Sequence, residues 1–277
     1  MITELHKSDF YKCRELVNKH GQLEVKAVIE GVNPGRIFVD DAKTPASGLI
    51  WLGNNDGFIF IGDEKNEGFN RELNGFIDQV IIPEAAKEGL AWFEAIGNHE
   101  KWYSTIEKVF KHRDLGSWNQ RVYILHNNDY NSQSEVSIDP KYSVLKINET
   151  LFHNQDNFIQ NIEFLHSKIL EFWTTPDAFF RNGIGYCVVH KNRIVSVCSS
   201  GFVVDGTHCI DIETLEEHQG QKLAQKVAHA FVKDCLAHNQ VPYWDCMESN
   251  KPSVAVAEKL GFCNTFNYDG YEFSMKK

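Results

Sequence analysis

No run in the sequence approaches the roughly 18 apolar residues that a membrane-spanning helix needs, and the N-terminal stretch has no apolar core flanked by basic residues. No pair among the seven cysteines has the spacing C-x-x-C, and several cysteines lie in apolar, strand-like runs where a thiol behaves as a small hydrophobic group. These absences argue against a signal peptide, a membrane anchor and a disulfide framework. We therefore expect a cytoplasmic protein without a membrane partner.

Common metal and nucleotide motifs are missing as well. None of the twelve histidines forms H-x-x-x-H or H-E-x-x-H, and "NHE" at residues 98–100 is interpreted as a polar turn, so no metal is expected. Neither the phosphate loop G-x-x-x-x-G-K-[ST] nor a G-x-G-x-x-G after a strand occurs. The formal net charge of −10 argues against a general affinity for nucleic acid, so any anion site must be local.

The length of 277 residues is comfortable for two domains, and 42% hydrophobic with 24% charged residues is typical of a globular protein. A polar, asparagine-rich stretch at residues 126–140 is the best linker candidate, which predicts domains at 1–130 and 131–277. In the first domain, short runs predicted as strands, among them "EVKAVIEG" at 24–31, mix with helical spacing at 101–112. This domain is predicted to be α/β, and no motif in it points to a chemistry.

The second half has a clearer order: strand, helix, three strands, helix, strand, helix and a closing strand region. This order predicts an α+β domain, a mixed sheet with flanking helices. The strand at 207–215 is followed by a helix that opens near Gly220, and the strand at 241–247 by a helix that Asn250 caps and Gly261 ends. If these strands are parallel neighbours, both helix N-termini open at one sheet edge. Their unpaired N–H groups would form a site for a phosphate-bearing ligand.

These residues resemble the GNAT N-acetyltransferases. The family hallmark Q/R-x-x-G-x-G/A corresponds to "QGQKLA" at residues 219–224, and the signature N-x-x-S/A running to K-L-G-F corresponds to residues 250–262. The stretch "WDCMESNKPSVAVAEKLGF" looks most similar to a branch that includes zwittermicin A resistance proteins. The resemblance covers residues 140–277, implies a mostly antiparallel sheet there, and suggests that the first half is a degenerate second copy of the fold.

The resemblance implies that acetyl-CoA lies in a cleft where the two parallel strands splay. Its pyrophosphate would accept backbone N–H groups at 221–224, its pantetheine would pair with the strand edge at 213–215, and the start of the second helix would touch the pantetheine end. The N–H near Thr214 would polarise the thioester. The expected binding residues are Thr214, Leu215, Gln219, Gly220, Gln221, Lys222, Leu223, Ala224, Asn250 and Ser253.

Two positions depart from the family pattern. Lys222 stands where the hallmark has glycine, so its side chain would either crowd the phosphate turn or compensate with its charge. Ala257 stands where a tyrosine often serves as the general acid, which leaves Ser253, Cys246, Tyr268 or Tyr271 to assist the leaving thiolate. Because the pKa of a thiol is near ~8.5, the reaction tolerates an unassisted leaving group.

An ammonium substrate must lose a proton before it attacks, and carboxylates at the strand ends are candidate bases. Glu213 is the first choice and Glu248 the second, so the predicted catalytic residues are Glu213, Glu248 and Ser253. Cys246 lies in an interior strand with no histidine near it in sequence, so no covalent enzyme intermediate is expected.

The sequence thus predicts an N-acetyltransferase that moves an acetyl group from acetyl-CoA directly to the amine of a small molecule in a ternary complex. An acidic protein favours cationic acceptors, and the nearest branch suggests antibiotic resistance. The oligomeric state is left open between monomer and homodimer. The alternative is a CoA-binding or structural module without activity, which Lys222 and Ala257 favour. A hydrolase finds no support, since G-x-S-x-G is absent.

Overall fold

The computed structural model describes residues 1–53, 55 and 57–276 and divides into two compact units. The first unit is Met1–Gln120 together with Tyr268–Lys277, and the second is Arg121–Asn267. Strands β6 (Gly116–Ile124) and β12 (Cys263–Ser274) carry residues of both units. The chain therefore changes unit before the predicted boundary at 130/131, and its last strand returns to the first unit.

The first unit is a sheet covered by helices, in the strand order β1-β2-β3-β4-β5-β12. Its further strands are β1 (Thr3–Glu4), β2 (Arg36–Val39), β3 (Ser47–Trp51), β4 (Gly57–Gly62) and β5 (Trp92–Gly97). Its helices are a 3-10 helix (Lys7–Leu16), α1 (Leu23–Ile29), α2 (Glu67–Phe76), a π-helical turn (Ile77–Ile81), α3 (Ile82–Lys87) and α4 (Trp102–Phe110). Pairing is antiparallel from β1 to β4, parallel between β4 and β5, and antiparallel between β5 and β12.

One predicted strand of this unit is wrong. The run "EVKAVIEG" at residues 24–31 suggested a strand because it is rich in β-branched residues, yet most of it is helix α1. Val25, Val28 and Ile29 are all buried, and their spacing of three and four residues is that of one helix face. Burial of that face outweighed the weak preference of these side chains for strands.

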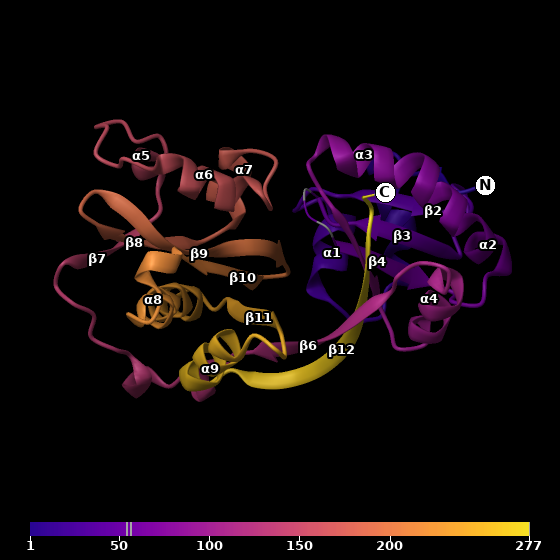
Figure 1. Ribbon diagram of the computed structural model, residues 1–277. Coiled ribbons are helices and arrows are strands. Elements are labelled where there is room, and N and C mark those ends of the chain that lie inside the picture. The colour runs from indigo at the N-terminus through magenta and orange to yellow at the C-terminus, as the bar shows by residue number, and fades with distance from the viewer. Residues whose placement is uncertain (54, 56, 277) are drawn as a thin grey trace. The chain divides into compact units, whose positions relative to one another are not determined.

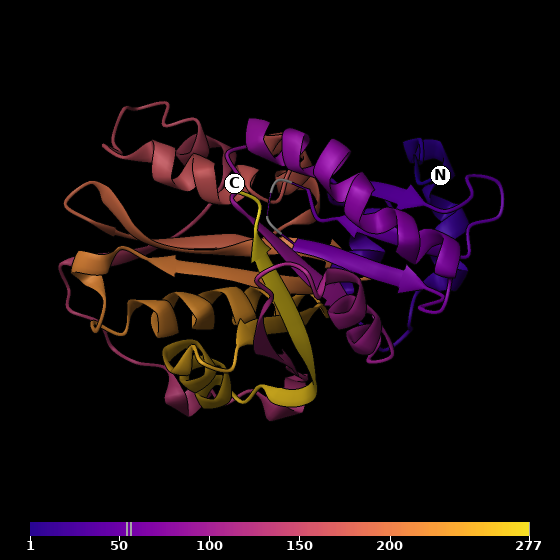
Figure 2. The ribbon, with the colours of Figure 1, turned by 45° about the vertical axis from the view of Figure 1, so that its right-hand side comes forward.

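The second unit repeats this arrangement in the strand order β6-β11-β10-β9-β8-β7. Its strands are β7 (Tyr142–Lys146), β8 (Gly185–His190), β9 (Arg193–Val204), β10 (Thr207–Thr214) and β11 (Val241–Met247). Its helices are α5 (Glu149–Phe152), α6 (Ile162–Leu170), α7 (Pro176–Asn182), α8 (Leu223–Ala237) and α9 (Lys251–Leu260). Figures 1 and 2 show α8 on one face of this sheet and α5, α6 and α7 on the other.

Two tight hairpins set the antiparallel part of this second sheet. Lys191 and Asn192 join β8 to β9 with φ of 47° and 61°, and Asp205 and Gly206 join β9 to β10 with φ of 50° and 72°. Two-residue turns with positive φ at both positions match the twist of paired strands. Antiparallel pairing then runs from β7 to β10, and β11 joins β10 in parallel.

Both units therefore have antiparallel strands followed by one parallel pair, with a helix after each strand of that pair: α2 and α4 in the first unit, α8 and α9 in the second. The predicted fold class, a mixed and mostly antiparallel sheet with flanking helices preceded by a related α/β copy, is confirmed. Among the described residues, no helix has the length and apolar character to cross a membrane.

The polar segment that was predicted as a linker holds α8 and α9 instead. The Tyr130 hydroxyl and His229 Nδ1 on α8 form a hydrogen bond of 2.9 Å, and Asn131 N donates to the carbonyl of Leu260 at the end of α9, also at 2.9 Å. Glu135 pairs with two lysines of α8. Because these contacts reach both helices, the segment fixes the two elements whose N-termini form the candidate site.

Candidate active site

The parallel strands β10 and β11 separate before they end. Their pairing stops at Cys209↔Tyr243, whereas β10 continues to Thr214 and β11 to Met247. On its other side β10 pairs with β9 from Thr207 to Thr214, with one bulge between His208 and Ile210. The divergence therefore leaves one edge of β10 facing a gap in the sheet, at the place where the sequence predicted a splay.

The backbone groups that face this gap follow from the strand geometry. Leu215 N donates to Val195 O of β9 at 2.9 Å, so this N–H is not available to a ligand. Successive residues of a strand direct their N–H and C=O to opposite sides. Ile212 and Thr214 consequently present theirs to the gap, and Thr214 O accepts a hydrogen bond from Gln219 Nε2 at 3.2 Å.

Helix α8 begins without a side-chain cap. Its N-cap residue, Lys222, has left-handed backbone angles (φ 62°, ψ 19°) and makes no capping hydrogen bond, and Gly220 just before it has φ 74°. The first intrahelical bond runs from Lys226 N to Lys222 O. The N–H groups of residues 223–225 therefore have no acceptor within the helix, and the helix dipole adds positive potential there.

Helix α9 begins differently, with its cap in place. Asn250 accepts a hydrogen bond from Ser253 N at 3.2 Å, and Pro252 lies in the first turn. Gly261 ends the helix with φ 98°, where a Cβ would lie 1.9 Å from the carbonyl oxygen of Asp129. The glycine is thus required both by its backbone angle and by the close approach of the polar segment.

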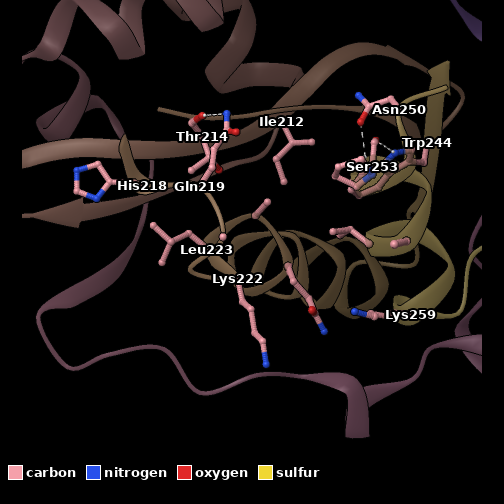
Figure 3. Close-up of a pocket in the computed structure, with 16 residues that line it drawn as sticks. Ile212, Thr214, His218, Gln219, Lys222, Leu223, Trp244, Asn250, Ser253 and Lys259 are labelled. Atoms are coloured by element: carbon pink, nitrogen blue, oxygen red, sulfur yellow. Dashed lines mark hydrogen bonds between the residues drawn. The ribbon is translucent and has the colours of Figure 1, made fainter. Parts of the chain in front are cut away.

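A cavity of about 590 Å³ lies between these elements (Figure 3). Its volume is in the range of small-molecule sites. The sixteen residues that line it include Lys222 and Lys259 but no aspartate or glutamate. In a chain with a net charge of −10, this lining gives the cavity a local excess of positive charge. Figure 3 shows the Lys222 side chain extending away from Ile212 and Thr214, so it does not fill the space beside the strand.

The structure brings most of the predicted binding residues to this cavity. Those that line it are Thr214, Gln219, Gly220, Lys222, Leu223, Ala224, Asn250 and Ser253, whereas Leu215 and Gln221 do not. His218, Gln225, Trp244 and Lys259 also line it and were missed. Lys259 could have been found, since it follows the lining residue Val256 by one helical turn.

Neither predicted base lines the cavity, and each forms an ion pair. Glu213 lies between Ile212 and Thr214 on β10, so alternation directs it to the opposite face of the sheet, where it pairs with Lys168 of α6 at 3.1 Å. Glu248 pairs with Arg121, whose guanidinium holds the pKa of that carboxyl below its usual value. A carboxylate stabilised in this way is a weak base.

Asp211 is a carboxylate better suited to act as a general base, but it was not predicted from the sequence. Lys168 Nζ contacts Glu171 at 2.7 Å, Glu213 at 3.1 Å and Asp211 at 3.6 Å, and we call these four residues the Lys168 cluster. Desolvation raises the pKa of Asp211 to about 6. Burial lowers the pKa of Lys168, but the surrounding carboxylates outweigh it and raise the pKa overall. Asp211 could have been found from its spacing of two from Glu213, which places both on one face.

The residues considered as the acid also have clear positions. Ser253 lines the cavity, and its Oγ accepts a hydrogen bond from Trp244 Nε1 at 3.0 Å and also lies against the Cys246 thiol. Ala257 is fully buried in the core. Tyr268 and Tyr271 belong to the first unit. Burial raises the pKa of the Cys246 thiol, which keeps it protonated and weakly nucleophilic at neutral pH.

The corresponding place in the first unit is closed. There β4 and β5 stay paired to Phe60↔Gly97, and Asn98 N extends the pairing to Phe60 O at 2.9 Å. The Phe60 ring packs on Trp102 of α4 with centroids 5.2 Å apart. The loop before α2 contains acidic residues, and Asn66 caps the helix by accepting from Phe69 N at 3.1 Å. Among the described residues of this copy, β4 and β5 leave no gap where β5 ends, and α2, the helix that corresponds to α8, begins with its cap in place.

The fold and the open cleft between β10 and β11 point to an acyltransferase of the GNAT type, and comparison with known proteins agrees. The profile of the family described as GNAT acetyltransferase matches residues 14–271. The chain is 28% identical over 274 residues to the uncharacterized N-acetyltransferase YdfB of Bacillus subtilis (strain 168), covering 98% of each chain. The protein belongs to the GNAT acetyltransferase family.

Solved structures show the same two-copy fold. A GCN5-related N-acetyltransferase-like protein from Streptococcus suis superposes with a TM-score of 0.73 at 19% identity, over 96% of this chain and 98% of that one. A tandem GNAT protein from the clavulanic acid biosynthesis pathway gives 0.61 at 12% identity, over 100% and 99%. Within the part of the chain that the structure describes, no three or more His, Cys, Asp or Glu side chains are arranged so that they could hold a metal ion.

Proposed function

We propose that the second unit binds acetyl-CoA in the described cavity and transfers the acetyl group to the amine of a small molecule. The observation that carries this proposal is the gap between β10 and β11, which opens onto the uncapped start of α8 and a cavity lined by lysines but no carboxylates. Phosphate groups suit such a helix start. The free edge of Ile212 and Thr214 suits the amides of pantetheine.

Each part of the proposed reaction has a residue suited to it. Acetyl-CoA supplies the thioester carbonyl that the amine attacks. N–H groups at 223–225 hold phosphate, and the N–H of Thr214 donates toward the thioester oxygen. On the far side of β10, Asp211 takes the proton of the acceptor ammonium, since a carboxylate with a pKa near the working pH is an efficient base. The departing thiolate takes the second proton, which the attacking nitrogen loses as the amide forms, and the Ser253 hydroxyl, positioned by Trp244, donates a hydrogen bond to that thiolate.

An inactive CoA-binding module is the less suitable reading, because neither departure from the family pattern closes the cleft. Lys222 adopts the backbone conformation that glycine would adopt, and Ala257 lies in the core away from the cavity. The proposal includes a cytoplasmic location, with which seven free thiols agree. It also includes protection against an amine-bearing antibiotic, as the resemblance to the zwittermicin A resistance branch suggests.

The test is the release of CoA thiol from acetyl-CoA across a panel of primary amines. We expect amine-dependent release by the wild-type protein and its loss in Gly220→Val, because a β-branched side chain at φ 74° distorts the phosphate turn. Gly206→Val is the matched control, since Gly206 has φ 72° and open space around it but lies in the β9–β10 hairpin, outside the cavity lining. CoA binding without amine-dependent release from any acceptor would favour the inactive module.

A further inference from the structure

The α6 face of β10 carries more negative than positive charge around one accessible point. Three carboxylates of the Lys168 cluster surround a single ammonium. Lys168 itself is 13% exposed, whereas the side chain of Asp211 is 21% exposed and that of Glu213 49% exposed. The carboxylates can therefore be reached from solvent, and their charge exceeds what Lys168 neutralises.

Two buried polar atoms beside this point need a hydrogen-bond donor. Within the described part of the chain, neither Asp211 Oδ2 nor Ser199 Oγ has a hydrogen-bond partner, and Ser199 is only 1% exposed. The two residues are directly opposed in the antiparallel pair of β9 and β10. Such partners share one face of the sheet with their Cβ atoms about 5 Å apart.

The neighbouring residue confirms the direction of Ser199. Ser200 Oγ forms a 2.9 Å hydrogen bond with His208 Nδ1, and the His208 ring packs on Phe231 of α8. Ser200 thus faces α8, and alternation directs Ser199 to the α6 face together with Asp211. Ser199 Oγ is thus a buried hydroxyl without a partner, and Asp211 Oδ2 has the long 3.6 Å contact to Lys168 Nζ in place of a hydrogen bond, so a ligand with N–H groups would supply what both atoms lack.

We infer that this face is the acceptor subsite, and that it selects primary amines that carry no carboxylate, such as alkylamines and diamines, over amino acids. The inference rests on the proposed acetyl transfer and adds the class of the acceptor. An ammonium has three N–H donors and the charge that the cluster lacks. A carboxylate on the same small molecule would be held near Asp211 and Glu213, where like charges repel.

The experiment compares three probes of similar length: n-butylamine, 1,4-diaminobutane and γ-aminobutyrate. Ligand-observed NMR measures their binding to the full chain with and without saturating CoA, so that amine binding is scored separately from CoA binding. We expect both amines to bind saturably and γ-aminobutyrate to bind at least about tenfold more weakly. Asp211→Asn should weaken amine binding about tenfold and Ser199→Ala about threefold, which is the effect of a lost hydrogen bond.

Asp139→Asn is the matched control, because Asp139 is half exposed, pairs with Lys141 and does not belong to the Lys168 cluster. It should leave amine binding unchanged, and thermal melts identify any variant that does not fold. The inference is overturned if γ-aminobutyrate binds as tightly as the amines, or if neither amine binds saturably. CoA binding measured in the same experiment would still support the proposed function. If the wild-type chain binds the amines selectively but does not bind CoA, the proposed function is overturned and the inference about the amines is not.

Discussion

Replacing Lys222 by glycine should stabilise the protein, because Lys222 has φ 62° at the start of α8. A side chain in the left-handed region costs roughly 1–2 kcal/mol. Glycine removes this cost but gives the unfolded chain more freedom, which offsets roughly 0.4–1 kcal/mol. At the midpoints of these ranges the net gain in the free energy of unfolding is about 0.8 kcal/mol, and for a unit of this size the melting temperature should rise by about 2–3 °C.

Differential scanning calorimetry measures this change, and two variants separate strain from charge. Lys222→Ala removes the charge but keeps Cβ, so its melting temperature should not rise. Lys191→Gly removes Cβ at φ 47° in the β8–β9 hairpin, away from the cavity, and should stabilise to a similar degree. The reasoning is refuted if Lys191→Gly raises the melting temperature and Lys222→Gly does not.

The same variants decide how Lys222 acts on CoA. Lys222 lines the cavity and its side chain extends away from the strand edge, so its charge should attract phosphate without blocking it. We expect Lys222→Gly and Lys222→Ala to weaken CoA binding equally, by about threefold to tenfold, and less at high salt because the interaction is screened. Tighter binding by Lys222→Gly would show that the side chain obstructs the phosphate turn.

Three further predictions concern the base, the acid and the polar segment. Asp211→Asn should lower kcat/KM about 100-fold or more without changing acetyl-CoA affinity. The rate of the wild-type enzyme should fall as pH drops below about 6, because Asp211 titrates there among the other charges of the Lys168 cluster. A flat pH profile would contradict the role of Asp211 as the base. Ser253→Ala should lower kcat up to about tenfold near pH 7. This loss of kcat should vanish above the thiol pKa of about 8.5, where the thiolate leaves unassisted. A loss of kcat that persists at pH 10 would show that the substitution acts on the structure and not on the leaving group. Two lysines lower the pKa of Glu135 to about 2, so its ion pairs stabilise the fold above the unfolded pKa near 4.5 and lose this effect as pH falls toward 2. Glu135→Gln should therefore cost about 1 kcal/mol at pH 7 and nothing at pH 2, as read from melting temperatures at the two pH values.

The parts of the site that could be predicted are those set by local rules. Asn250 as a cap and Gly261 as a terminator follow from the neighbouring residues alone, and the structure has both. The glycine pattern at 219–224 located the start of α8, and its family context located the cleft. Even the departure at Lys222 was informative, because a position that calls for glycine is one with positive φ.

The parts that could not be predicted depend on contacts between distant segments. Asp211 differs from Glu213 only in its surroundings, which α6 and β9 supply, so sequence alone favoured the more familiar strand-end position. Composition marked the polar segment as a linker, but its hydrogen bonds to α8 and α9 join residues about 100 positions apart or more. Nothing in the local sequence shows whether a polar stretch has such partners.

The central claim is that one copy of the fold is open to acetyl-CoA and the other is closed, and calorimetric titration of acetyl-CoA into the full chain tests it most directly. We predict one binding site per chain, competed by CoA and lost in Gly220→Val but not in Gly206→Val. Two sites per chain, or binding that survives Gly220→Val unchanged, would contradict the assignment of the cleft between β10 and β11. No heat and no competition at millimolar acetyl-CoA would contradict the binding itself.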